Sequence, residues 1–117
     1  MDDALCDAHL VESIDLNEYC VDNVPSSFLV RVSGDSMHLK GIQHDDIAVV
    51  DKSVHPREGS VVVAYYQGGF TIKALHFNPL RLVAFDGKDT VYPISEGDEF
   101  EVFGCVVSIV RSLKAQG

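Results

Sequence analysis

The sequence predicts a mostly β protein, a single compact domain of twisted antiparallel sheets. Its 117 residues suit one domain, and a hydrophobic content of 46% is enough to build one core. Short apolar or alternating runs recur along the chain, with most of the prolines and glycines between them, as is typical of short-strand architectures. The runs are residues 28–33, 47–51, 61–66, 70–77, 81–85, 91–95 and 100–110.

Two of these runs predict a tight hairpin. Residues 61–66 are apolar throughout, which indicates a strand buried on both faces. Gln67, Gly68 and Gly69 follow, and glycines supply the positive φ angles that tight turns need. Residues 70–77 are therefore expected to return antiparallel to residues 61–66.

The N-terminal part of the chain differs in character from the rest. Residues 1–27 hold seven acidic residues and no Lys or Arg, which favours a solvated arm. Asp15 is placed to cap a short helix through Cys20 that ends before Pro25. We therefore expect an acidic arm with a short helix over residues 1–27 and a β domain over residues 28–117.

The charge balance argues against direct contact with a nucleic-acid backbone. The chain carries 18 acidic and 9 basic residues, a net charge of -9, and its basic residues are scattered singly. Binding to phosphates needs clustered Lys and Arg. We therefore expect no direct grip on DNA.

Metal, cofactor and membrane sites are also not indicated. The 3 cysteines suit neither a disulfide framework nor a zinc motif, and the 5 histidines lack metal-ligand spacing. We expect reduced thiols, with Cys105 buried, no metal and no cofactor. No apolar run is long enough for a membrane helix and the first residues are acidic, so a cytoplasmic protein is expected.

Lys73 is a candidate general base. In a strand over residues 70–77 its side chain shares a face with Thr71, Leu75 and Phe77, so we expect mainly apolar neighbours. Loss of hydration disfavours the ammonium form of a lysine, and the neutral amine can accept a proton.

Ser36 is a candidate nucleophile, because it follows a predicted strand in the turn that begins at Gly34. A serine needs a base to become reactive, and Ser-Lys pairs can replace the Ser-His-Asp triad. The backbone N–H groups of Asp35 and Ser36 are candidates for an oxyanion hole. On pattern alone, an ordinary turn serine and a lysine that reaches to solvent remain open alternatives.

A series of short motifs, in a characteristic order and spacing, covers nearly the whole chain. They are Val-Ser-Gly-Asp-Ser-Met at 32–37, Gly-Ile at 41–42, Val-Val-Asp at 49–51, Gly-Ser-Val-Val-Val-Ala at 59–64, Phe-Thr-Ile-Lys at 70–73, Tyr-Pro-Ile at 92–94 and the run at 100–107. Together they resemble the LexA/UmuD-type self-cleaving serine peptidase family (S24). Gly-Asp-Ser-Met and the Ile-Asp-Leu-Asn stretch at 14–17 are closest to its UmuD branch, in a short UmuD′-like form.

This resemblance implies a LexA/signal-peptidase-like β fold and a Ser36–Lys73 dyad. It implies that Ser36 attacks a bond in the protein's own N-terminal arm when a RecA filament forms after DNA damage. The shortened product would then form a homodimer and join a Y-family DNA polymerase as an accessory subunit in translesion synthesis.

The chain departs from the family pattern at the substrate. The family cuts an Ala-Gly or Cys-Gly bond, and none of the 9 glycines here follows Ala or Cys. The expected place of the bond is at or just ahead of Met1, so we expect either a processed form or a homologue that is already short. Two other functions stay open: the peptidase and dimerisation core of a LexA-like or phage repressor, and a dimeric interaction module without catalysis.

Overall fold

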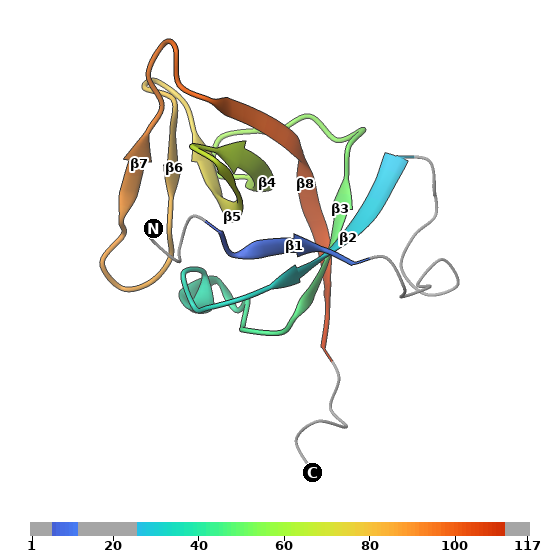
Figure 1. Ribbon diagram of the computed structural model, residues 1–117. Helices are drawn as coiled ribbons and strands as arrows, with labels where there is room; N and C mark the ends of the chain where they lie inside the picture. The colour runs from blue at the N-terminus through green and yellow to red at the C-terminus, as the bar shows by residue number, and fades with distance from the viewer. Residues whose placement is uncertain (1–5, 12–25, 112–117) are drawn as a thin grey trace.

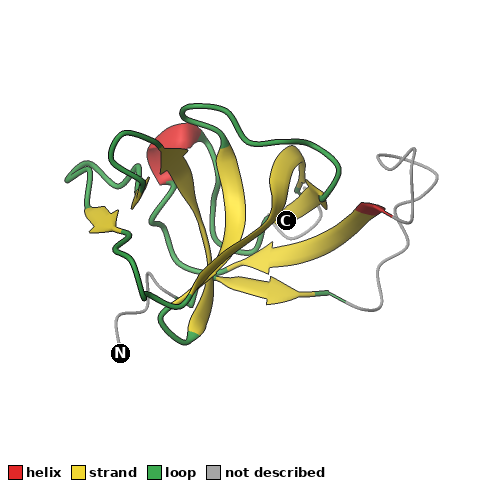
Figure 2. Ribbon diagram, turned by 90° about the horizontal axis from the view of Figure 1, so that it is seen from above, coloured by secondary structure: helices red, strands yellow, loops and turns green. Residues whose placement is uncertain are grey.

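The computed structural model describes residues 6–11 and 26–111, which form eight strands and short helical turns. The strands are β1 Ala8–Leu10, β2 Ser27–Val32, β3 Ile47–Asp51, β4 Val61–Tyr66, β5 Gly69–His76, β6 Arg81–Val83, β7 Val91–Pro93 and β8 Phe100–Val110. A 3-10 helix, η3, spans His38–Lys40. Figure 2 shows that strands and loops make up almost all of the described chain. The predicted mostly β single domain is confirmed.

All eight strands belong to one antiparallel sheet with the order β1-β2-β3-β8-β4-β5-β6-β7. The sheet curls, so that β1 at one end of this order also contacts β5 from the other half (Figure 1). The curl brings the N-terminal strand over the middle of the hairpin strand that carries Lys73. β1 and β5, which are far apart in the sequence, therefore lie in contact close to Lys73.

Strand β8 makes this curl possible, because it pairs with β3 at one end and with β4 at the other. The register shifts in both pairings, between Val49 and Val50 and between Val63 and Ala64. Gly104 lies at the crossing. A Cβ atom on Gly104 would lie 2.8 Å from Val50 Cγ1. Only glycine lets the strands approach this closely.

The predicted hairpin is confirmed. β4 and β5 pair antiparallel from Val61 opposite Ala74 to Tyr66 opposite Gly69. The positive φ angles of the turn belong to Gln67 (50°) and Gly68 (91°), whereas Gly69, predicted as part of the turn, begins β5. Three apolar clusters cover the two faces of the sheet, and the cluster nearest Ser36 includes Ala8 from β1.

The N-terminal arm differs from its predicted solvated character where the structure describes it. Residues 6–11 include strand β1, and Asp7 and Ala8 are buried. The helix expected from Asp15 to Cys20 lies outside the described residues. Within the described ranges, no helix combines the length and apolar character that crossing a bilayer requires.

Candidate active site

Ser36 lies in the turn that follows β2, and hydrogen bonds fix this turn on both sides of the residue. Gly34, with a φ of 82°, turns the chain, and its N–H donates to His44 Nδ1 at 2.9 Å. The carbonyl of Ser36 accepts the N–H of Phe85 at 2.8 Å, and the carbonyl of Asp35 accepts the N–H of His38 at 3.1 Å. The backbone at Ser36 is thereby held in place, and the residue is 8% exposed.

Lys73 lies in the middle of β5, opposite Val62 of β4, and is fully buried. Its Nζ is 3.2 Å from Ser36 Oγ and 2.6 Å from Thr71 Oγ1. The ring of Tyr92 lies 5.8 Å from the same nitrogen. The curl of the sheet thus brings the two predicted site residues within hydrogen-bond reach, although they are 37 positions apart in the sequence. Their catalytic roles stay predictions.

The amine of Lys73 has a charged neighbour that the sequence did not reveal. Asp7 is the residue immediately before β1. Its Oδ2 atom lies 2.7 Å from Lys73 Nζ and 2.5 Å from Ser36 Oγ. The expectation of mainly apolar neighbours is therefore wrong at the end of the side chain. It failed because side-chain alternation describes β5 alone and is blind to a segment 66 positions away.

The other oxygen of Asp7 is also bound. Oδ1 accepts the hydroxyl of Thr71 at 2.9 Å and the backbone N–H of Ile72 at 2.8 Å. Four donors from Ser36 and β5 therefore surround one carboxylate. Burial of a charged pair is costly unless its remaining hydrogen-bonding groups are satisfied. Within the described residues, every buried side-chain nitrogen and oxygen atom has a partner.

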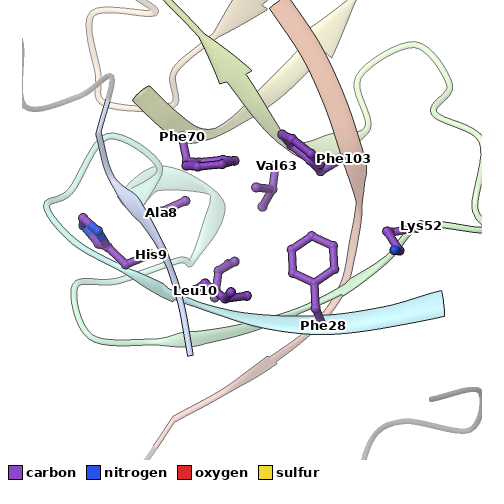
Figure 3. A pocket seen from close by; sticks show the side chains of 9 residues that line it. Ala8, His9, Leu10, Phe28, Lys52, Val63, Phe70 and Phe103 are labelled. Carbon is purple, nitrogen blue, oxygen red and sulfur yellow. The ribbon is translucent and has the colours of Figure 1, made fainter. Parts of the chain in front are cut away.

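A largely apolar hollow adjoins β1 on the side where the sheet curls (Figure 3). Its volume is about 490 Å³. The lining residues are Ala8, His9, Leu10, Phe28, Val30, Lys52, Val63, Phe70 and Phe103. Three of them belong to β1, so the same segment that delivers Asp7 also forms one wall of the hollow. An apolar side chain of a bound peptide would fit its character.

The cysteines and histidines form no second centre in the part of the chain described. Cys105 is buried as predicted, and its Sγ donates to the carbonyl of Val54 at 3.4 Å. Burial, with a smaller contribution from the charge of Asp51, raises the pKa of the Cys105 thiol. No group of three or more His, Cys, Asp or Glu is arranged to hold a metal ion among the described residues.

Comparison with known proteins identifies the class to which this fold and site belong. The model of the family described as Peptidase S24-like matches residues 3–107. The chain therefore belongs to the Peptidase S24-like family, a family of serine peptidases.

Individual relatives agree with this assignment. Protein SamA of Salmonella typhimurium is 35% identical over 104 residues, which cover 89% of this chain and 73% of SamA. Protein MucA of Escherichia coli is 37% identical over 97 residues, 81% of this chain and 66% of MucA. The LexA repressor of Syntrophobacter fumaroxidans is 32% identical over 104 residues, 88% of this chain but 50% of the repressor.

Proposed function

We propose that the chain is a UmuD-type SOS mutagenesis protein whose peptidase centre is the Ser36–Lys73 dyad. The observation that carries the proposal is the 3.2 Å distance between Ser36 Oγ and Lys73 Nζ in a buried site of an S24 fold. This distance lies near the upper limit for direct proton transfer between the two groups. Thr71, 2.6 Å from Nζ, would hold the amine toward the serine.

In the proposed reaction the neutral amine of Lys73 takes the proton of Ser36, and Oγ attacks the carbonyl carbon of the scissile bond. The N–H groups of Asp35 and Ser36 stabilise the oxyanion that forms. The carbon–nitrogen bond then breaks as Lys73 returns the proton to the leaving amine. Water, deprotonated by the same amine, releases the acyl group from Ser36. The substrate bond is an Ala-Gly or Cys-Gly bond in an N-terminal arm, with a RecA filament promoting the reaction.

The proposal extends to an accessory role after cleavage. A homodimer of the short form would join a Y-family DNA polymerase in translesion synthesis. The support is the ordered motif match to the UmuD branch, together with the similarity to SamA and MucA. A net charge of -9 fits a subunit that contacts the polymerase rather than the DNA backbone.

Cleavage of a full-length partner in trans tests the peptidase part. The partner is a UmuD-type protein that retains its Ala-Gly or Cys-Gly arm and carries alanine in place of its own nucleophile. We expect cleavage that accelerates as the pH is raised, because the base must be a neutral amine. Lys73→Ala should abolish cleavage, and Lys88→Ala, which removes an exposed lysine, should leave it unchanged. Cleavage that persists in Lys73→Ala would exclude the dyad.

The similarity to a LexA repressor supports one alternative, the peptidase and dimerisation core of a repressor. Co-expression with a Y-family polymerase separates the two functions. The UmuD-type role predicts a complex that copurifies. A chain that dimerises without capturing the polymerase, encoded together with an upstream DNA-binding segment, would favour the repressor core.

A further inference from the structure

We propose that residues 6–11 form a resident strand, which blocks the Ser36–Lys73 centre through the side chain of Asp7. A substrate reaches Ser36 only when this strand moves away. This inference rests on the proposed function for its effect on catalysis. The placement of Asp7 rests on the structure alone.

Asp7 accepts hydrogen bonds from four donors of the site. Oδ2 accepts Ser36 Oγ and Lys73 Nζ, and Oδ1 accepts Thr71 Oγ1 and the N–H of Ile72, all within 2.9 Å. Asp7 is 1% exposed. A carboxylate held by four donors, one of them charged, is a specific contact rather than a chance approach of an acidic residue.

The backbone around Asp7 follows the path of a strand added to the edge of the sheet. β1 extends the sheet by pairing antiparallel with β2, with Ala8 opposite Val32. The carbonyl of Asp7 accepts the N–H of Ser33 at 3.0 Å, and Val11 donates to the carbonyl of Leu29 at 3.0 Å. An extended segment added to an edge strand is the way many proteins bind peptides. Residues 6–11 thus lie as a peptide ligand would, with the side chain of Asp7 at the reactive groups.

The contacts of Asp7 also direct the protons of Ser36 and Lys73 away from the arrangement that catalysis needs. Asp7 Oδ2 forms an ion pair with Lys73 Nζ at 2.7 Å, and an ammonium group has no lone pair with which to act as a base. The Ser36 hydroxyl donates to Asp7, and Lys73 donates to Ser36 Oγ. Attack on a substrate requires the reverse, with Ser36 donating to Lys73. Asp7 Oδ2, 2.5 Å from Ser36 Oγ, also occupies space next to the candidate nucleophile.

The strand that Asp7 anchors is short and lies at the edge of the sheet. β1 has three residues and pairs in the sheet with β2 alone among the described strands. Ala8 packs in the core, whereas Leu10 is 64% exposed. Edge segments of this size open more easily than central strands. The contacts of Asp7 therefore supply much of what holds β1 in place.

Two measurements on Asp7→Ala test the inference: hydrogen exchange at the amides of residues 8–10, and the rate of trans cleavage of the full-length partner. Loss of a charge-assisted contact should accelerate both by about tenfold or more. Asp7→Asn, which keeps the size of the side chain, should show a smaller acceleration and guards against misfolding of the alanine variant. Glu101→Gln removes one exposed carboxylate from β8 and should change neither rate.

The outcomes separate this inference from the proposed function. Faster exchange in residues 8–10 with no cleavage by any variant would support the resident strand and overturn the peptidase proposal. Unchanged exchange and unchanged cleavage in both Asp7 variants would overturn the resident strand. A fall in cleavage on removal of Asp7 would also overturn it, because Asp7 would then be needed for catalysis.

Discussion

Two aspartates of this protein, Asp7 and Asp46, are each 1% exposed, and each pairs with a basic residue far along the chain. The carboxylate of Asp46 accepts hydrogen bonds from Arg111 Nε at 2.7 Å and Arg111 Nη2 at 2.8 Å. It also accepts one from the N–H of Gln43 at 2.8 Å. The carboxylate of Asp7 accepts hydrogen bonds from Lys73 Nζ and from the hydroxyl of Ser36. The partners differ in chemistry, because a guanidinium stays charged in proteins and a buried lysine can lose its proton.

The positions of the two aspartates in the fold differ as well. Asp46 immediately precedes β3 in the interior of the chain, and its fork with Arg111 ties that loop to the end of β8. Asp7 precedes a short edge strand that can move away without unfolding the sheet. A buried aspartate that pairs with a distant basic residue thus ties a loop to the scaffold in one region, where Arg111 is 38% exposed, and lies at the candidate Ser36–Lys73 centre in the other, where Lys73 is fully buried.

The largest effect is expected for Lys73→Met, which keeps the volume of the side chain and removes its charge. Trans cleavage should be lost, because the base is gone. The carboxylate of Asp7 would be left buried without a counter-ion, which costs about 3–5 kcal/mol where the group cannot escape. Since β1 can carry Asp7 into water, we expect faster hydrogen exchange at residues 8–10 and a smaller loss in the free energy of unfolding.

Arg111→Met is the matched control for this prediction. Asp46 cannot leave its loop, so the free energy of unfolding should fall without release of β1. If hydrogen exchange at residues 8–10 were equally fast in Lys73→Met and Arg111→Met, the Asp7–Lys73 and Asp46–Arg111 pairs would not differ in the way described.

A smaller effect is expected for Asp46→Asn. Loss of the charge-assisted fork should lower the free energy of unfolding by about 2 kcal/mol, measured by urea denaturation. Trans cleavage by the folded protein should stay as in the wild type, because Asp46 does not contact Ser36 or Lys73. A large loss of cleavage with unchanged stability would show that the loop at Asp46 controls the centre directly.

The smallest expected effect is the change in the free energy of unfolding at acidic pH that the carboxyl group of Asp46 causes. The hydrogen bonds from Arg111, then the N–H of Gln43, hold the pKa of Asp46 below its ordinary value of 3.8, against the opposing effect of burial. A carboxyl group with a lowered pKa stabilises the folded state above its unfolded pKa, and that contribution is lost as pH falls through the folded pKa. The stability difference between wild type and Asp46→Asn should therefore be constant near neutral pH and shrink below 3.8. A difference that is independent of pH down to the acid limit would exclude this linkage.

Much of the scaffold was predictable from the sequence, because its strands depend on local pattern. Continuous or alternating apolar runs predicted 47–51, 61–66 and 100–110 with the bounds that the structure has for β3, β4 and β8. The glycines after Gln67 predicted the hairpin that carries Lys73. The family motifs pointed to Ser36 and Lys73.

The N-terminal half of the candidate site could not be predicted in the same way. β1 has three residues, Ala-His-Leu, which are too few to show a period, and its place depends on pairing with β2. Asp7 is one of seven acidic residues in an acidic arm, and its contact with Lys73 spans 66 positions. Only the curl of the sheet, set by β8 and Gly104, brings these residues together.

The most direct test of the central claim is to react the protein with a serine-directed phosphonate and to locate the adduct by peptide mass mapping. Asp7→Ala is the protein of choice, with Ser36→Ala and Lys73→Ala made in the same background. The Ser-Lys dyad predicts one adduct, on Ser36, that is absent from both further variants. An adduct on another residue, or labelling of Ser36 at an undiminished rate without Lys73, would contradict it.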